Sequence, residues 1–262
     1  MGKYNSSEHR VVPFMDYIKD NLGELNILLS LLEQPGCDFR ITSTPKKENI
    51  FYGKNEKCLK PFKKHLLEMI SHVSNHYSYY KSIKNKDRAQ LFSADPNIRK
   101  VKQAEAIKCL NDQYENLSAN SRNWFVFEGF TQPDIFIEGD DYILLGEGKW
   151  TEKHITESTF HLNENNGGYR NQMVRHIEGA LNYCESNNLN KCIIAFYIVD
   201  DDCTYKESLS KDSFIKQLSK ETISKDDELK QKIIDSFAGF TTWQKVEAAF
   251  PNMKRFKTKQ EL

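Results

Sequence analysis

The sequence predicts an α/β fold, with a mixed central sheet flanked by helices and a helical region before it. Three observations predict this class. Apolar residues recur at helical spacing through the first third of the chain. Past residue 120 the pattern changes to short apolar runs that are typical of strands. A further helical stretch then separates these runs from one last apolar run, as in a strand–helix–strand crossover.

The first third, residues 1–95, is expected to be a helical accessory region. Residues 14–32 and 57–83 both have amphipathic spacing, and Pro-Gly at 35–36 separates them. Residues 49–52 could form a short strand between the two helices. The Ala-Asp-Pro sequence at 94–96 breaks the helical pattern, so we expect the main domain to span 96–262, with a helical C-terminal extension.

The main domain is expected to contain six elements before its C-terminal extension. They are a helix at 98–117, strands at 123–127, 134–138 and 142–149, a helix at 169–185, and a strand at 191–199. The Gly-Asp-Asp sequence at 139–141 has the residues of a hairpin turn, so the second and third strands should be antiparallel neighbours. The last strand is an unbroken apolar run, which is typical of a strand buried on both faces.

Composition indicates an ordinary globular protein, because 39% of the 262 residues are hydrophobic and 28% are charged. We expect an intracellular, cytoplasmic protein, since no apolar run approaches the ~20 residues of a membrane span and the N-terminus lacks an apolar signal core. The six cysteines form no C-x-x-C pair, which favours free thiols. Net charge is zero, but residues 40–102 hold 15 Lys and Arg against 5 Asp and Glu. That surplus could contact phosphates or simply be a solvated helical surface.

The most informative segment is Pro133-Asp134, followed by Glu147-Gly148-Lys149. Side chains alternate along a strand, so Glu147 and Lys149 share one face at the end of the third strand. Asp134 begins the neighbouring strand, and the hairpin should bring it beside Glu147 and Lys149. Considered singly, Asp134 could be a turn residue after proline, and Glu147 and Lys149 could form a surface ion pair. Together they predict a site.

Two carboxylates and an amine at one place suit metal-assisted chemistry. Two close carboxylates repel each other, and a divalent cation relieves the repulsion. Oxygen ligands suit Mg²⁺ or Mn²⁺, and the carbonyl of Gly148 could be a further ligand. A bound metal can lower the pKa of a water and neutralise charge on a phosphate. Lys149 could hold that water or stabilise the transition state.

Asp134, Glu147 and Lys149 match the motif of the PD-(D/E)xK, or restriction endonuclease-like, superfamily. The resemblance covers roughly residues 98–199, where the expected helix, three strands, helix and strand also resemble the core of that superfamily. It implies a Mg²⁺- or Mn²⁺-dependent nuclease in which Asp134 and Glu147 bind metal and Lys149 assists the attack on a phosphodiester. Nucleic acid, with DNA favoured, is the implied partner. Many members act as dimers, so a homodimer is compatible with the resemblance.

The helix after the motif carries Gln172, Arg175 and His176, and Gln172 and His176 lie four residues apart on one face. Members of the superfamily often direct a polar residue from this helix at the site. The resemblance implies that Gln172 orients water or phosphate and that Arg175 or His176 contacts phosphate. The alternative is an ordinary polar helix face. Superfamily members also add an upstream acid, for which the candidates are Glu105, Glu115 and Glu128.

Two functions are therefore compatible with the sequence. The first is a metal-dependent deoxyribonuclease guided to its substrate by the basic N-terminal region. The second is a nucleic-acid-binding or assembly module of the same fold with little or no catalysis. The intact Asp–Glu–Lys set favours the first, whereas zero net charge favours the second. The sequence leaves open DNA against RNA, strand form, recognition sequence, endo- against exonuclease action, and the biological pathway.

Overall fold

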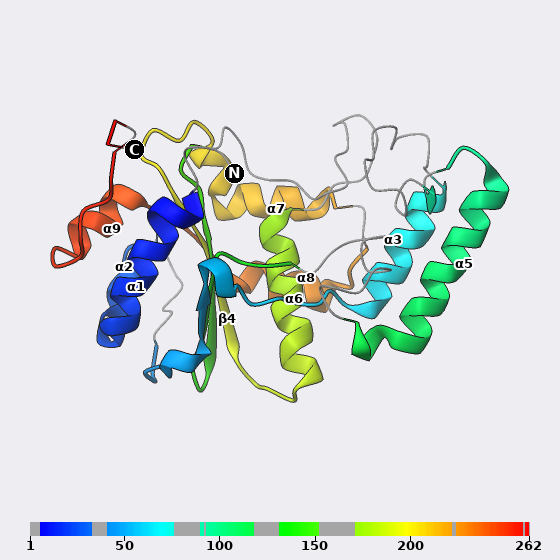
Figure 1. Ribbon diagram of the computed structural model, residues 1–262, viewed down its shortest axis with the longest axis horizontal. Helices are drawn as coiled ribbons and strands as arrows, with labels where there is room; N and C mark the ends of the chain where they lie inside the picture. The colour runs from blue at the N-terminus through cyan, green and yellow to red at the C-terminus, as the bar shows by residue number, and fades with distance from the viewer. Residues whose placement is uncertain are drawn as a thin grey trace.

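A mixed sheet runs through the middle of the molecule with helices on both sides, as the computed structural model shows (Figure 1). The structure describes residues 6–32, 41–75, 90–91, 93–117, 131–151, 171–221, 224–258 and 260–261. In these ranges the sheet has five strands, in the order β1-β2-β3-β4-β5. The predicted α/β class with a mixed sheet is thus confirmed.

The sheet changes from antiparallel to parallel at its centre. Its strands are β1 (Ile50–Tyr52), β2 (Ile135–Glu138), β3 (Tyr142–Gly148), β4 (Cys192–Val199) and β5 (Phe237–Thr242). The β1–β2 and β2–β3 pairs are antiparallel, and the β3–β4 and β4–β5 pairs are parallel. Strand β3 is buried along its whole length, because strands flank it on both edges and helices cover both its faces. The predicted hairpin and crossover are both present.

One face of the sheet is covered by helices from the two ends of the chain. These are the helical turn Ser7–Val11, α1 (Val12–Asp20), α2 (Leu25–Ser30) and α9 (Trp243–Ala249), which lie to the left of the sheet in Figure 1. Phe14 of α1 and Trp243 of α9 pack edge to face, 6.3 Å apart, over the side of the sheet that carries Leu144. The division of the chain at residue 95 stays a prediction, and α1 and β1 belong to the main core.

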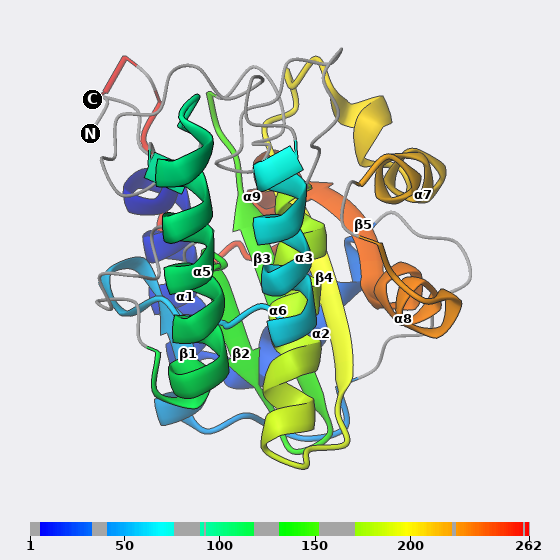
Figure 2. The ribbon, with the colours of Figure 1, turned by 90° about the vertical axis from the view of Figure 1, so that its right-hand side faces the viewer.

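The opposite face is covered by α6 (Gln172–Ser186), α7 (Lys211–Ser219) and α8 (Asp227–Ser236). Ile143 and Leu145 of β3 point into this second core, as strand alternation requires. Helices α3 (Lys63–Asn75) and α5 (Pro96–Gln113) pack on each other outside α6 (Figure 2). The side-chain amide of Asn182 on α6 donates to the carbonyl of Lys60, before α3, at 2.9 Å and to the hydroxyl of Tyr114, after α5, at 3.1 Å.

Three expectations about the elements differ from the structure, and one lies outside it. The helix expected from residue 57 begins at Lys63, because Pro61 disfavours helical backbone before it. The helix expected over 14–32 is broken at Asn21, whose φ of −129° is not helical. Strand β5 falls in the part expected to be mostly helical. The strand expected at 123–127 lies outside the described residues.

Short single turns of 3-10 helix connect several of these elements. They are Leu22–Glu24, Lys47–Asn49, Gly53–Asn55, Tyr114–Asn116 and Lys206–Leu209. Within the described ranges, no helix has the length and apolar character that crossing a membrane requires.

Candidate active site

The hairpin register places Asp134 opposite Glu147 at the carboxyl end of β3. Ile135 pairs with Gly146, so the residues one step further out face each other. The backbone N–H of Gly148 donates to Asp134 Oδ2 at 2.9 Å. Lys149 Nζ donates to Glu147 Oε1 at 2.8 Å. The structure therefore brings together the three residues of the predicted motif.

Glu147 and Lys149 point to the α6 side of the sheet, where α6 supplies two more side chains. Gln172 bridges the pair, because its Nε2 donates to Glu147 Oε1 at 2.8 Å and its Oε1 accepts from Lys149 Nζ at 3.2 Å. His176 Nε2 lies 3.0 Å from Glu147 Oε2. The side chain of Asn171 caps α6 by accepting from the N–H of Met173 at 2.8 Å, which fixes where the helix begins.

His176 is bound differently from the phosphate contact that the resemblance implies. Its ring is 2% exposed, and its Nδ1 lies 2.5 Å from the hydroxyl of Thr131. Both ring nitrogens are therefore engaged inside the protein. Arg175, one position before, is half-buried, and its contact with phosphate stays a prediction. Thr131 has no motif in the sequence, so no sequence signal marks it.

Glu147 is an ionised carboxylate surrounded by donors. Burial alone would raise its pKa, but Lys149 and the hydrogen bond from His176 outweigh burial and lower the pKa to about 2. For His176 burial is the larger effect and lowers the pKa of the ring, in spite of Glu147. A neutral imidazole has one N–H, and a carboxylate can only accept, so that N–H is on Nε2.

The pKa of the Asp134 carboxyl is shifted in the opposite direction to that of Glu147. Burial raises the pKa of its carboxyl well above the usual 3.8, and the negative charge of Glu147 raises it further, against the N–H of Gly148 and the charge of Lys149. Glu56 also acts on Asp134. Burial and then Glu147 raise the pKa of Glu56 to about 7. Carboxyl groups whose pKa is raised by burial and by a neighbouring charge are typical of functional sites.

Glu56 is the acid that the sequence did not mark. Its segment runs beside the start of β2, because Tyr52 pairs with Ile135 and Leu59 with Thr131 on either side of it. The sequence predicts a short strand at 49–52 and a helix from 57, and Glu56, which lies between them, belongs to no motif. Only the long-range pairing of residues 50–59 with 131–137 brings it to the site.

The three upstream acids proposed from sequence lie elsewhere or outside the described residues. Glu105 is exposed on α5 and forms an ion pair with Lys102 at 3.0 Å. Glu115 is exposed in the turn after α5. Glu128 lies outside the described residues. The structure therefore favours Glu56 over Glu105 and Glu115 as the third acid near the site.

The backbone around Gly148 and Lys149 is fixed from several sides. A Cβ at residue 148 would lie 2.5 Å from Val11 Cγ2 and 3.0 Å from the ring of Trp243, so only glycine fits without a shift. The N–H of Lys149 donates to the carbonyl of Ile198 at 2.8 Å, and its carbonyl accepts from Trp243 Nε1 at 2.9 Å. Both ends of the chain thus help to position Lys149.

The donor set fits a hard divalent cation. Mg²⁺ in proteins is commonly held by one or two carboxylates together with waters or substrate oxygens. Asp134 and Glu147 provide two such carboxylates on neighbouring strands. In the part of the chain that the structure describes, no group of three or more His, Cys, Asp or Glu side chains is placed to hold a metal by itself. A ligand role for the carbonyl of Gly148 stays a prediction.

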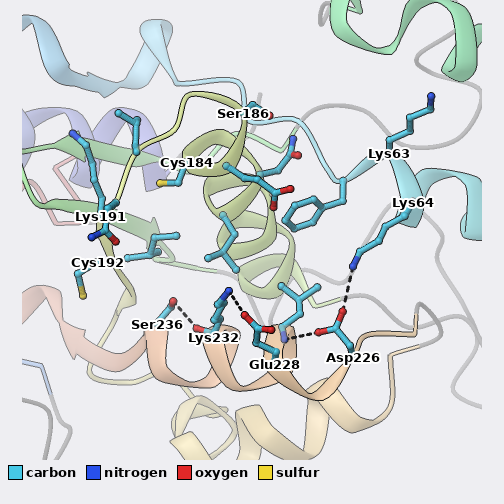
Figure 3. Close-up of a pocket in the computed structure, with 18 of the residues that line it drawn as sticks. Lys63, Lys64, Cys184, Ser186, Lys191, Cys192, Asp226, Glu228, Lys232 and Ser236 are labelled. Atoms are coloured by element: carbon cyan, nitrogen blue, oxygen red, sulfur yellow. Dashed lines mark hydrogen bonds and ion pairs between the residues drawn. The ribbon is translucent and has the colours of Figure 1, made fainter.

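A separate groove of about 870 Å³ lies between α6, α8 and the start of α3 (Figure 3). It contains none of Asp134, Glu147, Lys149 or Gln172. Several charged side chains of its rim are paired with each other: Lys64 with Asp226 at 3.3 Å and Lys232 with Glu228 at 2.6 Å. The cluster at the end of β3 is therefore the better candidate for chemistry, because its carboxyl groups have perturbed pKa values and converge.

Comparison of the chain with protein-family models, with curated proteins and with solved structures gave no match.

Proposed function

We propose that this protein is a metal-dependent nuclease of the PD-(D/E)xK kind, which hydrolyses phosphodiester bonds, with DNA as the expected substrate. One observation carries the proposal. Asp134, Glu147 and Lys149 converge at the carboxyl end of β3, and Gln172 joins Glu147 to Lys149 from the facing helix. Two carboxylates can hold a metal ion for phosphodiester hydrolysis, and a lysine and a glutamine beside them can stabilise charge and orient the reacting groups.

Each side chain has a role that follows from its charge and position. Asp134 and Glu147 would hold Mg²⁺ or Mn²⁺, and either ion when bound neutralises phosphate charge and lowers the pKa of a water. Lys149 is held beside Glu147 and offers its ammonium group to the negative charge that develops on the phosphate. Gln172 restrains both side chains, so that Lys149 does not lose its orientation when Glu147 takes up a ligand.

The sheet supports the same proposal. The antiparallel β1–β2–β3 part followed by the α6 crossover to β4 has the order that the superfamily resemblance implies. In the described residues, the strand on the outer side of β2 is formed by residues 50–52. Helices α3 and α5 are then an insertion between β1 and β2. Most of the basic surplus lies at 46–64 and 81–88, so a substrate-guiding role would belong to these segments.

A second candidate, a nucleic-acid-binding or assembly module with little catalysis, is favoured by one specific observation. Both carboxylate oxygens of Glu147 already accept hydrogen bonds from Lys149, Gln172 and His176. A metal ion would have to share Oε2 with His176 or displace one of these donors. Cytoplasmic location and a homodimer stay predictions under either candidate.

The test is a cleavage assay on supercoiled plasmid, linear duplex and single strands, with Mg²⁺, Mn²⁺ or EDTA. The wild-type protein is compared with Lys149→Ala and with Lys232→Ala, which removes an exposed lysine of α8 as a matched control. We expect metal-dependent cutting that survives Lys232→Ala and is lost in Lys149→Ala. A folded wild-type protein that cuts no substrate would favour the binding module.

A further inference from the structure

A buried chain of three side chains reaches the site from the segment before β2. The Thr131 hydroxyl lies 2.5 Å from His176 Nδ1, and His176 Nε2 lies 3.0 Å from Glu147 Oε2. Thr131 and His176 are each 2% exposed. No solvent competes for these hydrogen bonds, so each partner has a strong effect on the orientation of the next.

The direction of these hydrogen bonds follows from the chemistry of the groups. Glu147 is ionised and only accepts, so the nitrogen facing it must carry a proton. Lys149 already balances the charge of Glu147 at 2.8 Å, so a second buried cation would lack a partner of its own. With Nε2–H donated to Glu147, Nδ1 of a neutral ring is an acceptor, and the Thr131 hydroxyl is the donor to it.

The position of Thr131 is itself fixed. Its N–H and carbonyl both bond to Leu59, at 3.0 and 2.9 Å. Helix α6 approaches this bridge closely because residue 179 is glycine: a Cβ there would lie 2.8 Å from Leu59 Cβ and 3.0 Å from Thr131 Cγ2. Gly179 follows His176 by three residues on the same helix face. The close approach at Gly179 therefore brings His176 within reach of Thr131.

We propose that Thr131 is a positioning residue that holds the His176 ring with its Nε2–H directed at Glu147, and so orients Glu147 for its role in the site. Without the hydroxyl, the imidazole ring could direct either Nε2 or Nδ1 at Glu147, and nothing at residue 131 would favour one ring orientation over the other. Glu147 Oε2 then lacks a fixed donor, while its Oε1 is still shared by Lys149 and Gln172. The expected loss of activity rests on the proposed nuclease function, whereas the orientation of the His176 ring by Thr131 does not.

Two substitutions separate the hydroxyl from the shape of the side chain. Thr131→Val keeps the volume and removes the donor, whereas Thr131→Ser keeps the donor. Loss of a group that orients a ligand residue typically costs about 10- to 100-fold in activity or metal affinity. We expect kcat to fall by about that factor in Thr131→Val, with KM for DNA changed by less than about twofold. Thr131→Ser should restore most of kcat. Equal activity of Thr131→Val and wild type, or equal loss in both variants, would overturn the proposal.

A spectroscopic measurement tests the same inference without any cleavage. Long-range ¹⁵N–¹H correlation spectra report which nitrogen of a neutral histidine carries the proton, and His176→Gln identifies the signals of His176. We expect a proton on Nε2 in wild type and in Thr131→Ser, and a mixed or changed pattern in Thr131→Val. An unchanged His176 pattern in Thr131→Val would overturn the inference. If the wild type cuts nothing, the nuclease proposal fails and this spectrum still decides the role of Thr131.

Discussion

Replacement of Asp134 by asparagine should stabilise the protein, although Asp134 belongs to the candidate active site. Burial and the charge of Glu147 raise the pKa of the Asp134 carboxyl well above 3.8. The folded protein therefore stabilises the protonated form, and ionisation of Asp134 at neutral pH costs folding free energy. Asparagine has almost the same shape and retains an oxygen that can accept the N–H of Gly148, but it has no charge.

The size and sign of the stability difference between Asp134→Asn and the wild type follow from the raised pKa of Asp134. Below pH 3.8 Asp134 is protonated in both folded and unfolded chains, so the variant should gain nothing from the lost charge. Above it the unfolded chain releases the proton first, and wild-type stability falls until pH passes the folded pKa. Each unit of pKa elevation corresponds to about 1.4 kcal/mol. For a chain of this size that is roughly 3–5 °C in Tm.

Thermal unfolding of the two proteins in EDTA, from about pH 4 to about pH 8, measures this difference. We expect the Tm of Asp134→Asn to exceed that of the wild type by a margin that grows with pH. Asp202→Asn is the matched control, because Asp202 is exposed in the loop after β4 and its loss should change little. A margin independent of pH, or a variant less stable throughout, would refute the electrostatic account of Asp134.

Three further predictions concern packing, positioning and metal binding. Gly179→Ala should lower the free energy of unfolding in urea by about 1–3 kcal/mol through overpacking, less the ~1 kcal/mol that alanine gains in a helix; a net gain would contradict the close approach of α6. Trp243→Phe removes the buried donor to the Lys149 carbonyl, so it should cost about 1 kcal/mol or more of stability and reduce kcat; unchanged cleavage would contradict a positioning role. Mg²⁺ affinity measured by calorimetry should rise from about pH 6 to about pH 8, because Asp134 must lose its proton to bind metal and ionisation of nearby Glu56 adds negative charge beside the site; affinity independent of pH would contradict this.

The elements around β3 could be predicted because their signals are local. The hairpin residues at 139–141, the apolar runs of β3 and β4, and the helical spacing of α6 all lie within short stretches of sequence. The short strand expected at 49–52 is confirmed as β1, but its pairing with β2, more than 80 residues further on, has no local signal in the sequence. Strand β5 follows directly on α8, and its Gly239 has a φ of +85°, which obscures the period of a strand.

The residues of the site also divide into those with a local sequence signal and those that only tertiary contact brings to the site. Asp134, Glu147 and Lys149 could be predicted because one hairpin register determines all three positions. Gln172 could be predicted because the helix after the hairpin faces the same side of the sheet. The contribution of Glu56 comes from a segment far away in the chain, and that of Thr131 depends on how closely α6 approaches it. No local sequence pattern predicts the contribution of Glu56 or that of Thr131.

Plasmid cleavage and thermal unfolding of one folded variant, Asp134→Asn, test the central claim most directly when both are measured on the same sample with the wild type alongside. If Asp134 is a metal-binding acid that is kept in an unfavourable site for chemistry, the variant should be more stable than the wild type at neutral pH and should not cut in Mg²⁺. A variant that cuts as well as an active wild type would contradict the assignment of Asp134 to a nuclease site.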